Sequence, residues 1–190
     1  MVERNLGVAV LAAGSSRRFG DADKLAQMFR GRRLGEHVTS AIPRERFQSA
    51  WVIAGTGTSP CALFWEEAGF TEISNPNHAE GMGTSVALAA TLASEAGCDA
   101  LLIALADMPV VPRSHFEALI ASDADIATSA KDGARLPPVL FGKQHFEALS
   151  QLSGDRGARD LLARGQIVDC PREWLIDIDT PQDLQRYGQG

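Results

Sequence analysis

Small residues followed by cations near the start of the chain form its most suggestive combination for chemistry. Residues 11–20 read L-A-A-G-S-S-R-R-F-G, and Asp23 and Lys24 follow. Glycine and alanine let backbone N–H groups approach a ligand, and successive amides beside cationic side chains form a cradle for phosphates. This is not a Walker A loop, because five residues separate Gly14 from Gly20 and Lys24 comes four residues later. The segment therefore predicts a phosphate-binding turn with a different spacing.

The charge of the chain is unevenly distributed. The whole chain of 190 residues carries a net charge of −6, whereas residues 15–33 hold six basic and two acidic side chains, or +4. A cationic segment on an acidic chain favours a small anionic ligand, with a solvated surface loop as the alternative interpretation. Nucleic acid is not expected as a partner, because it requires a basic face. A membrane span is not expected either, because no apolar run reaches the roughly 18 residues required.

A second candidate is Asp107, which follows the strongly apolar stretch 99–106 (D-A-L-L-I-A-L-A). A carboxylate at the end of a buried strand, beside a phosphate site, suits a Mg²⁺ ligand. Pro109 fixes the backbone beyond it and restricts Met108 to extended geometry. The alternative is that Asp107 caps a helix expected over residues 112–121. The motif alone does not separate these two interpretations.

A third candidate lies in residues 174–184, which read W-L-I-D-I-D-T-P-Q-D-L. The pattern predicts a strand over 173–178, with Asp177 and Asp179 directed to opposite faces. Thr180 and Pro181 are typical of a helix start, as N-cap and first helical residue. Asp177 is the predicted second metal ligand, and Asp179 is the alternative.

Residues 80–86 (E-G-M-G-T-S-V) place glycines just before an expected helix, where N-terminal amides can meet an anion. The segment also looks like a loose nucleophile elbow of a hydrolase. An elbow needs a strand immediately before its serine, however, and residues 75–78 (N-P-N-H) interpose a loop before Ser85. The pattern therefore favours ligand binding over a nucleophilic serine.

Strand and helix patterns alternate along the chain. Apolar runs predict strands over 7–13, 49–54, 71–74, 99–106, 125–129, 138–141 and 173–178, and helical periods fall over 83–95, 112–121, 143–152, 155–164 and 181–187. The alternation predicts one α/β domain over residues 1–190, with three layers and a mostly parallel central sheet. Ligands of such sheets bind beyond the carboxyl ends of the strands. Residues 14–24 and Asp107 should therefore face one crevice.

Cysteine usage indicates the compartment. Cys61, Cys98 and Cys170 are odd in number and widely spaced, so neither a disulfide framework nor a zinc site is expected. The cytoplasm, which keeps thiols reduced, is the expected location.

Taken together, the segments resemble the nucleotidyltransferase-like (NTP transferase) family that includes molybdenum cofactor cytidylyltransferase and guanylyltransferase. The likeness runs from about Gly7 to Leu184. It is carried, in order, by L-A-A-G-S-S-R-R-F-G…D-K, N-P-N…E-G-M-G-T-S-V, L-A-D-M-P, P-V-L-F, G-D-R-G-A-R and D-I-D-T-P-Q-D-L. The resemblance implies a Rossmann-like nucleotidyltransferase fold and a single NTP transferase domain.

The resemblance also implies a reaction and a set of residues. An acceptor phosphate would attack the α-phosphorus of an NTP and release pyrophosphate, with Mg²⁺ as cofactor. Arg18, Lys24 and Asp107 would be the catalytic residues, and Asp107 and Asp177 would bind the metal. The implied nucleotide-binding residues are Leu11, Ala12, Ala13, Gly14, Ser15, Arg18, Lys24, Gly81, Gly83, Ser85 and Asp107.

Two features bear on the substrates. The guanylyl branch of the family typically reads L-A-G-G, so the methyl group of Ala13 would narrow the pocket against a purine and favours CTP. The implied acceptor is molybdopterin or the molybdenum cofactor, with a molybdoenzyme apoprotein as a further partner. However, residues 135–138 read R-L-P-P where many cytidylyl members have Gly-His before the proline, and Ala106 stands where glycine is common. The alternatives are a transferase for a sugar or polyol phosphate, and a non-catalytic nucleotide-binding accessory protein for molybdoenzyme maturation.

Overall fold

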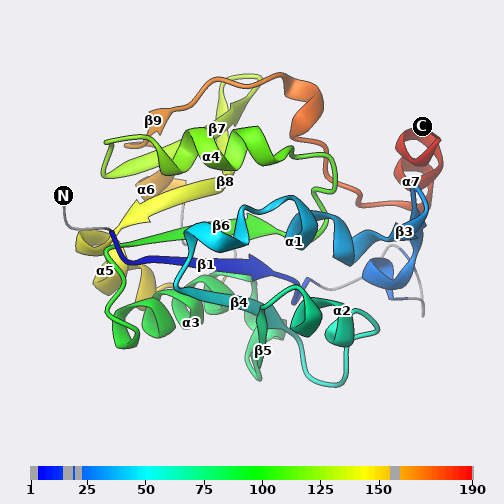
Figure 1. The fold of residues 1–190 in the computed structure, drawn as a ribbon, viewed down its shortest axis with the longest axis horizontal. Helices are drawn as coiled ribbons and strands as arrows, with labels where there is room; N and C mark the ends of the chain where they lie inside the picture. The colour runs from blue at the N-terminus through cyan, green and yellow to red at the C-terminus, as the bar shows by residue number, and fades with distance from the viewer. Residues whose placement is uncertain (1–3, 15–18, 20–22, 155–158, 190) are drawn as a thin grey trace.

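A twisted sheet forms the centre of the molecule (Figure 1). The computed structural model describes residues 4–14, 19, 23–154 and 159–189. Over these ranges the central sheet has seven strands in the order β5-β4-β1-β6-β8-β7-β9. In chain order they are β1 (Leu6–Leu11), β4 (Ser49–Ala54), β5 (Thr71–Ser74), β6 (Ala100–Leu105), β7 (Ile126–Lys131), β8 (Ala134–Gly142) and β9 (Gln166–Ile167).

The sheet is mostly parallel, which confirms the predicted fold class. β1 pairs in parallel with β4 on one side and with β6 on the other, and β5 extends this set beside β4. β8 runs antiparallel to both β6 and β7, and β9 pairs in parallel with β7. The register aligns Leu11 with Leu105, so β1 and β6 end level with each other. Whatever follows these two strands therefore meets at one edge of the sheet.

Helices and short turns connect the strands. The helices are α1 (His37–Ala41), α2 (Ala62–Glu67), α3 (Met82–Glu95), α4 (Arg113–Ile120), α5 (Phe146–Ser150), α6 (Arg159–Leu162) and α7 (Pro181–Gly188). Single turns of 3₁₀ helix are η2 (Lys24–Ala26), η3 (Leu34–Glu36), η4 (Arg44–Arg46), η5 (His78–Glu80), η6 (Lys143–His145) and η7 (Arg172–Trp174). A two-stranded ribbon of β2 (Met28–Phe29) and β3 (Arg32–Arg33) lies beside α7 (Figure 1).

Two hydrophobic clusters on opposite faces of the sheet make the three layers. Alternation along β1 directs Val8 and Val10 into a cluster that includes side chains of α1, α2 and α4. It directs Ala9 and Leu11 into the other cluster, which includes side chains of α3, α5 and α6. β1 and β6 are buried on both faces, which explains why their sequences are continuously apolar rather than alternating.

The predicted strand over residues 173–178 is wrong. The chain there forms η7 and then an irregular segment. Leu175 and Ile178 are fully buried in the first cluster, and the backbone N–H of Ile178 donates to the carbonyl of Asp107 at 2.9 Å. Apolar residues that anchor an irregular segment produce the same sequence pattern as a strand. The consequence for function is that Asp177 and Asp179 do not project from a pleated strand.

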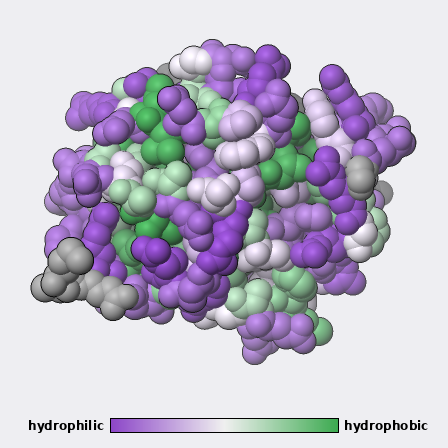
Figure 2. Space-filling view, turned by 45° about the horizontal axis from the view of Figure 1, so that its top comes forward, coloured by the Kyte–Doolittle hydropathy of each residue, from purple (hydrophilic) through white to green (hydrophobic). Residues whose placement is uncertain are grey.

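The exposed surface is mainly hydrophilic, with separate apolar patches, as Figure 2 shows for one face. Among the described residues, the exposed large hydrophobic side chains are Met28, Leu63, Met82 and Ile167. No helix in the described parts of the chain combines the length and apolar character needed to cross a bilayer.

The central position of β6 generates a prediction for stability. β6 lies between β1 and β8, and its residue Leu102 is completely buried in the first cluster. Leu102→Ala should therefore lower the free energy of unfolding by about 2–5 kcal/mol through lost burial and a residual cavity. Urea unfolding followed by circular dichroism measures the change. Leu63→Ala in α2, where the side chain is 76% exposed, is the control and should change stability by less than about 0.5 kcal/mol. Equal effects of the two substitutions would contradict the described core.

Candidate functional site

A cavity of about 560 Å³ lies where β1 and β6 end. The backbone N–H of Ala12 donates to Ile53 and that of Ala106 to Leu11, which holds the chain after each strand against its neighbour. Of the residues singled out from the sequence, the cavity is lined by Leu11, Ala12, Ala13, Gly14, Lys24, Gly81, Ser85 and Asp107. Ser15 and Arg18 lie outside the described residues. The structure thus brings three segments distant in sequence to one cavity.

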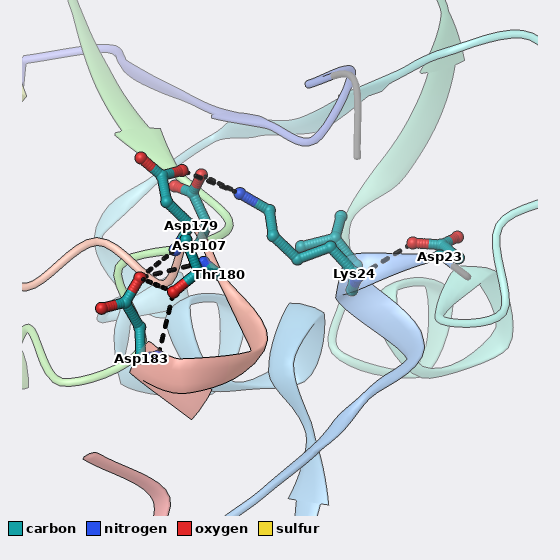
Figure 3. A network of polar contacts seen from close by, with 7 residues as sticks. Asp23, Lys24, Asp107, Asp179, Thr180 and Asp183 are labelled. Carbon is teal, nitrogen blue, oxygen red and sulfur yellow. Dashed lines mark hydrogen bonds and ion pairs between the residues drawn. The ribbon is translucent and has the colours of Figure 1, made fainter. Parts of the chain in front are cut away.

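Lys24 joins two aspartates across this cavity (Figure 3). Its Nζ lies 2.7 Å from Oδ2 of Asp107 and 3.4 Å from Oδ1 of Asp179. Only 10% of the Lys24 side chain is exposed, compared with 25% for Asp107 and 50% for Asp179. The carboxylate of Asp107 therefore pairs with Lys24 at this cavity. It does not cap α4, which begins after Pro112 without a side-chain cap.

Local hydrogen bonds fix the position of Lys24. Asp23 precedes η2 and its side chain accepts from the backbone N–H of Leu25 at 2.9 Å. The carbonyl of Lys24 accepts from the N–H of Gln27, and Leu25 is buried in the core beneath it. The turn is therefore anchored on both sides of Lys24, and its side chain extends toward the aspartates.

The start of α7 positions Asp179. Thr180 is the N-cap and Pro181 the first helical residue, as the sequence predicts. Asp183 completes a capping box: its carboxylate accepts from the backbone N–H and hydroxyl of Thr180 at 2.9 and 2.7 Å, and from the N–H of Asp179 at 3.3 Å. The Thr180 hydroxyl, followed by these backbone N–H groups, lowers the pKa of Asp183. A structural carboxylate thus holds the backbone that carries the functional candidate.

Asp177 is the third carboxylate of the group. It is exposed to the solvent of the cleft, but surrounding protein partly desolvates it. This desolvation, together with repulsion from Asp107 and Asp179, raises its pKa to about 6. Lys131 and Lys24 oppose the rise. We refer to Asp107, Asp177 and Asp179 below as the carboxylate cluster.

Ser85 lies within α3 and is buried. Asn75, which follows β5, donates to the hydroxyl oxygens of Ser85 at 2.9 Å and Thr84 at 3.0 Å. A serine inside a helix does not have the strand-to-helix turn of a nucleophile elbow. Because its oxygen already accepts a hydrogen bond, the Ser85 hydroxyl can direct its proton toward a ligand in the cavity.

A second cavity of about 870 Å³ adjoins the first, and Leu11 and Met82 line both. Its wall is mainly apolar, with Arg135 and Asp177 as its charged residues. Gly83 lines this second cavity rather than the first. A Cβ at Gly83 would come within 2.6 Å of the carbonyl of Gly154, which accepts from the Gly83 N–H. Glycine here therefore permits a close backbone contact.

The lining residues of the first cavity that were not selected from the sequence include three with polar or flexible side chains, namely His78, Glu80 and Met82. Their closeness in sequence to Gly81 and Gly83 could have indicated that they line the same cavity. The ring of His78 packs on Gly55, where a Cβ would come within 3.3 Å of it. His78 and Glu80 belong to η5, a single turn whose sequence lacks helical periodicity.

The carboxylate cluster can be tested against the needs of a magnesium ion. Among the described residues, no three Asp, Glu, His or Cys side chains are arranged to enclose a metal by themselves. Mg²⁺ is commonly bound by one or two carboxylates together with substrate phosphates and water. Desolvation, followed by repulsion from Asp107 and Asp179, raises the pKa of Asp177, and a divalent cation would relieve the repulsive part. The residues therefore fit a Mg²⁺ ion that arrives with phosphates.

Comparison with known proteins identifies the family. Residues 8–169 match the MobA-like NTP transferase domain. The purine catabolism protein PucB of Bacillus subtilis (strain 168) is 32% identical over 196 residues, covering 91% of each chain. The molybdenum cofactor guanylyltransferase of Shewanella sp. (strain ANA-3) is 28% identical over 196 residues, covering 95% of this chain and 94% of the relative.

Solved structures support the fold. Rv0371c from Mycobacterium tuberculosis H37Rv covers the whole of both chains with a TM-score of 0.75 at 20% identity. A complex of Rv0371c with manganese matches with a TM-score of 0.68 at 20% identity, covering 97% of this chain and 98% of that one. The family match and the relatives in sequence, whose fold the solved structures share, therefore lead to one conclusion: this chain belongs to the MobA-like NTP transferase domain family of nucleotidyltransferases.

Proposed function

We propose that this protein transfers CMP from CTP to molybdopterin or the molybdenum cofactor and releases pyrophosphate. The observation that carries the proposal is the meeting of Lys24, Asp107 and Asp179 at the mouth of a cavity lined by Ala12, Ala13 and Gly14. A cation and a metal-binding pair of carboxylates beside a backbone turn are the parts that phosphoryl chemistry requires.

The reaction needs positioning and charge neutralisation more than acid–base groups. An oxygen of the acceptor phosphate attacks the α-phosphorus, and the bond from that phosphorus to the pyrophosphate oxygen breaks. Lys24 donates hydrogen bonds to the phosphates, and the turn after β1 binds the ribose and base. When bound, Mg²⁺ neutralises charge on the phosphate oxygens. Asp107 would hold it, with Asp177 or Asp179 as second ligand; the shared contact with Lys24 favours Asp179 on geometry.

The second cavity supports a ring-shaped acceptor over a sugar or polyol phosphate. Val86, Val139, Phe141 and Leu162 are among its lining side chains, and they offer no partners for the hydroxyl groups of a polyol. A flat pterin buries well against such side chains, and Arg135 lies at the same cavity as a cation for the acceptor phosphate. Leu11 and Met82 line both cavities, so an acceptor in the second cavity would lie next to a nucleotide in the first.

Ala13 supports CTP, although the Shewanella relative is named a guanylyltransferase. Ala13 lines the first cavity, where its methyl group would narrow the space for a purine ring. One methyl group in a pocket is worth about 1–3 kcal/mol of discrimination.

The role of Asp107 can be tested by Asp107→Asn. If it binds the metal, the substitution should lower the Mg²⁺-dependent rate of pyrophosphate release at least about a hundredfold, because metal coordination contributes several kcal/mol to the transition state. The matched control is Asp125→Asn, at an exposed position before β7. Activity near the wild-type level in a folded Asp107→Asn protein would remove Asp107 from the site.

The base preference can be tested by Ala13→Gly. Removal of the methyl group should shift the ratio of kcat/KM for CTP over GTP toward GTP by about 5- to 100-fold. Pyrophosphate release with each nucleotide measures the ratio, with molybdopterin as acceptor. The control is Ala118→Gly on the exposed face of α4, which should leave the ratio unchanged. An unchanged ratio in Ala13→Gly contradicts the pocket argument.

The raised pKa of Asp177, caused by desolvation and then by repulsion from Asp107 and Asp179, predicts a pH-dependent gain in stability from Asp177→Asn. The folded-state pKa of about 6 exceeds the ordinary value of 3.8, so ionisation of Asp177 increasingly disfavours the folded state as pH rises between these values. The variant cannot ionise. Its melting temperature relative to wild type should therefore rise from pH 4 to pH 7 and stay constant above.

The measurement is thermal unfolding in EDTA without nucleotide, with Asp123→Asn on an exposed turn as control. A gain that is independent of pH would contradict the raised pKa of Asp177.

A further inference from the structure

The ammonium group of Lys24 contacts two of the proposed metal ligands, Asp107 and Asp179. Its ammonium is 2.7 Å from Asp107 and 3.4 Å from Asp179, and its side chain is largely buried. Figure 3 shows the lysine reaching these carboxylates from the other side of the cavity. The arrangement is a positive charge placed between two negative charges in a partly desolvated site, where ion pairing is stronger than at an exposed surface.

Both sides of this ion pair are fixed by independent hydrogen bonds. Asp23 and Leu25 hold the turn that carries Lys24. On the other side, the carbonyl of Asp107 accepts from the N–H of Ile178, and the capping box of α7 holds Asp179. The fold therefore holds the backbone on both sides of the contact. A ligand that separates its members must move side chains, and the long stem of lysine has more freedom than the short side chain of aspartate.

An ammonium ion and a divalent cation compete for these carboxylate oxygens. Mg²⁺ requires oxygen ligands at about 2.0–2.1 Å in a nearly octahedral arrangement. Oδ2 of Asp107 already accepts from Lys24 at 2.7 Å, and a metal ion at that oxygen would lie against the ammonium and repel it. A metal that arrived alone would have to disrupt the ion pairs of the largely buried Lys24 with Asp107 and Asp179, and this opposes its binding.

A triphosphate changes this competition, because it offers Lys24 another set of anionic oxygens in the same cavity. The lysine side chain is a point charge on a flexible four-carbon stem, so it can turn from a carboxylate to a phosphate without movement of its backbone. The carboxylates then become available to the cation that accompanies the nucleotide.

We propose that Lys24 acts as a place-holder cation, by which we mean that its ammonium pairs with the carboxylate cluster and prevents free divalent metal from binding there. The carboxylates become available to the metal only when a nucleoside triphosphate binds and Lys24 turns to its phosphates. The inference rests on the proposed function and adds a binding order to it: metal and nucleotide enter together, and the protein does not retain the metal between turnovers. It gives Lys24 a second role besides phosphate binding, with an effect of opposite sign on metal affinity.

Binding of Mn²⁺ alone to the nucleotide-free protein tests this role. Electron paramagnetic resonance of free Mn²⁺ during a titration gives the dissociation constant. Lys24→Met and Lys24→Gln should each bind Mn²⁺ at least about tenfold more tightly than wild type, which corresponds to about 1.4 kcal/mol. Lys24→Arg keeps the positive charge and should show no gain. Asp107→Asn combined with Lys24→Met should lose the gain, which would locate it at the carboxylate cluster.

A second titration contains the α,β-methylene analogue of CTP, which cannot transfer CMP. In its presence the order should reverse: wild type should bind Mn²⁺ more tightly than either neutral variant, because only wild type supplies a cation to the phosphates. Circular dichroism first establishes that each variant is folded, and Lys24→Gln serves if Lys24→Met does not fold.

The proposal is overturned if the folded neutral variants bind Mn²⁺ alone no more tightly than wild type. Lys24 would then have only a structural role, as the cation of an ion pair. This failure is distinct from failure of the proposed function. If wild type releases pyrophosphate but the variants show no gain in Mn²⁺ affinity, only the place-holder role of Lys24 is rejected. A gain in Mn²⁺ affinity without pyrophosphate release from any NTP would reject the proposed function and retain the place-holder.

Discussion

The ion pair between Lys24 and Asp107 connects the parts of the molecule on which chemistry depends. Its members lie 83 positions apart in the sequence, and Lys24 and Asp179 lie 155 positions apart. The pair is possible because β1 and β6 lie side by side in parallel and end level, so the segments that follow them meet at one edge. Removal of Asp107 would leave the largely buried ammonium of Lys24 with its longer contact to Asp179, and removal of Lys24 would take away the cation that lies against both carboxylates. The site and the sheet are therefore coupled energetically.

The two adjoining cavities differ in character. The first combines exposed backbone with Lys24 and Asp107, which suits a polyphosphate, whereas the second is largely apolar and suits a ring. Leu11 and Met82 border both, so two ligands bound in them would come into contact there. The carboxylate cluster spans the boundary, because Asp107 lines the first cavity and Asp177 the second. Such contact between two substrates provides the proximity that phosphoryl transfer needs.

Some sequence patterns predict the observed elements, and others do not. The strands over 49–54 and 71–74 were predicted with their observed limits, because turn residues bound them. The strand predicted over 173–178 was wrong, because burial of Leu175 and Ile178 comes from packing of an irregular segment against the core. Short elements such as α1 and the β2–β3 ribbon carry too few residues for a period to emerge, and tertiary contacts decide them.

The sequence by itself determined the α/β class, the alternation of elements and the types of residue that end the strands, since these follow from local periodicity and backbone chemistry. It also pointed to Lys24, Asp107 and the acidic pair 177/179 as candidates. Only the tertiary structure decided how these charges are arranged: Lys24 lies between Asp107 and Asp179, and Asp177 is repelled by both. Distances and desolvation between residues far apart in sequence depend on how the layers pack. No local pattern in the sequence encodes them.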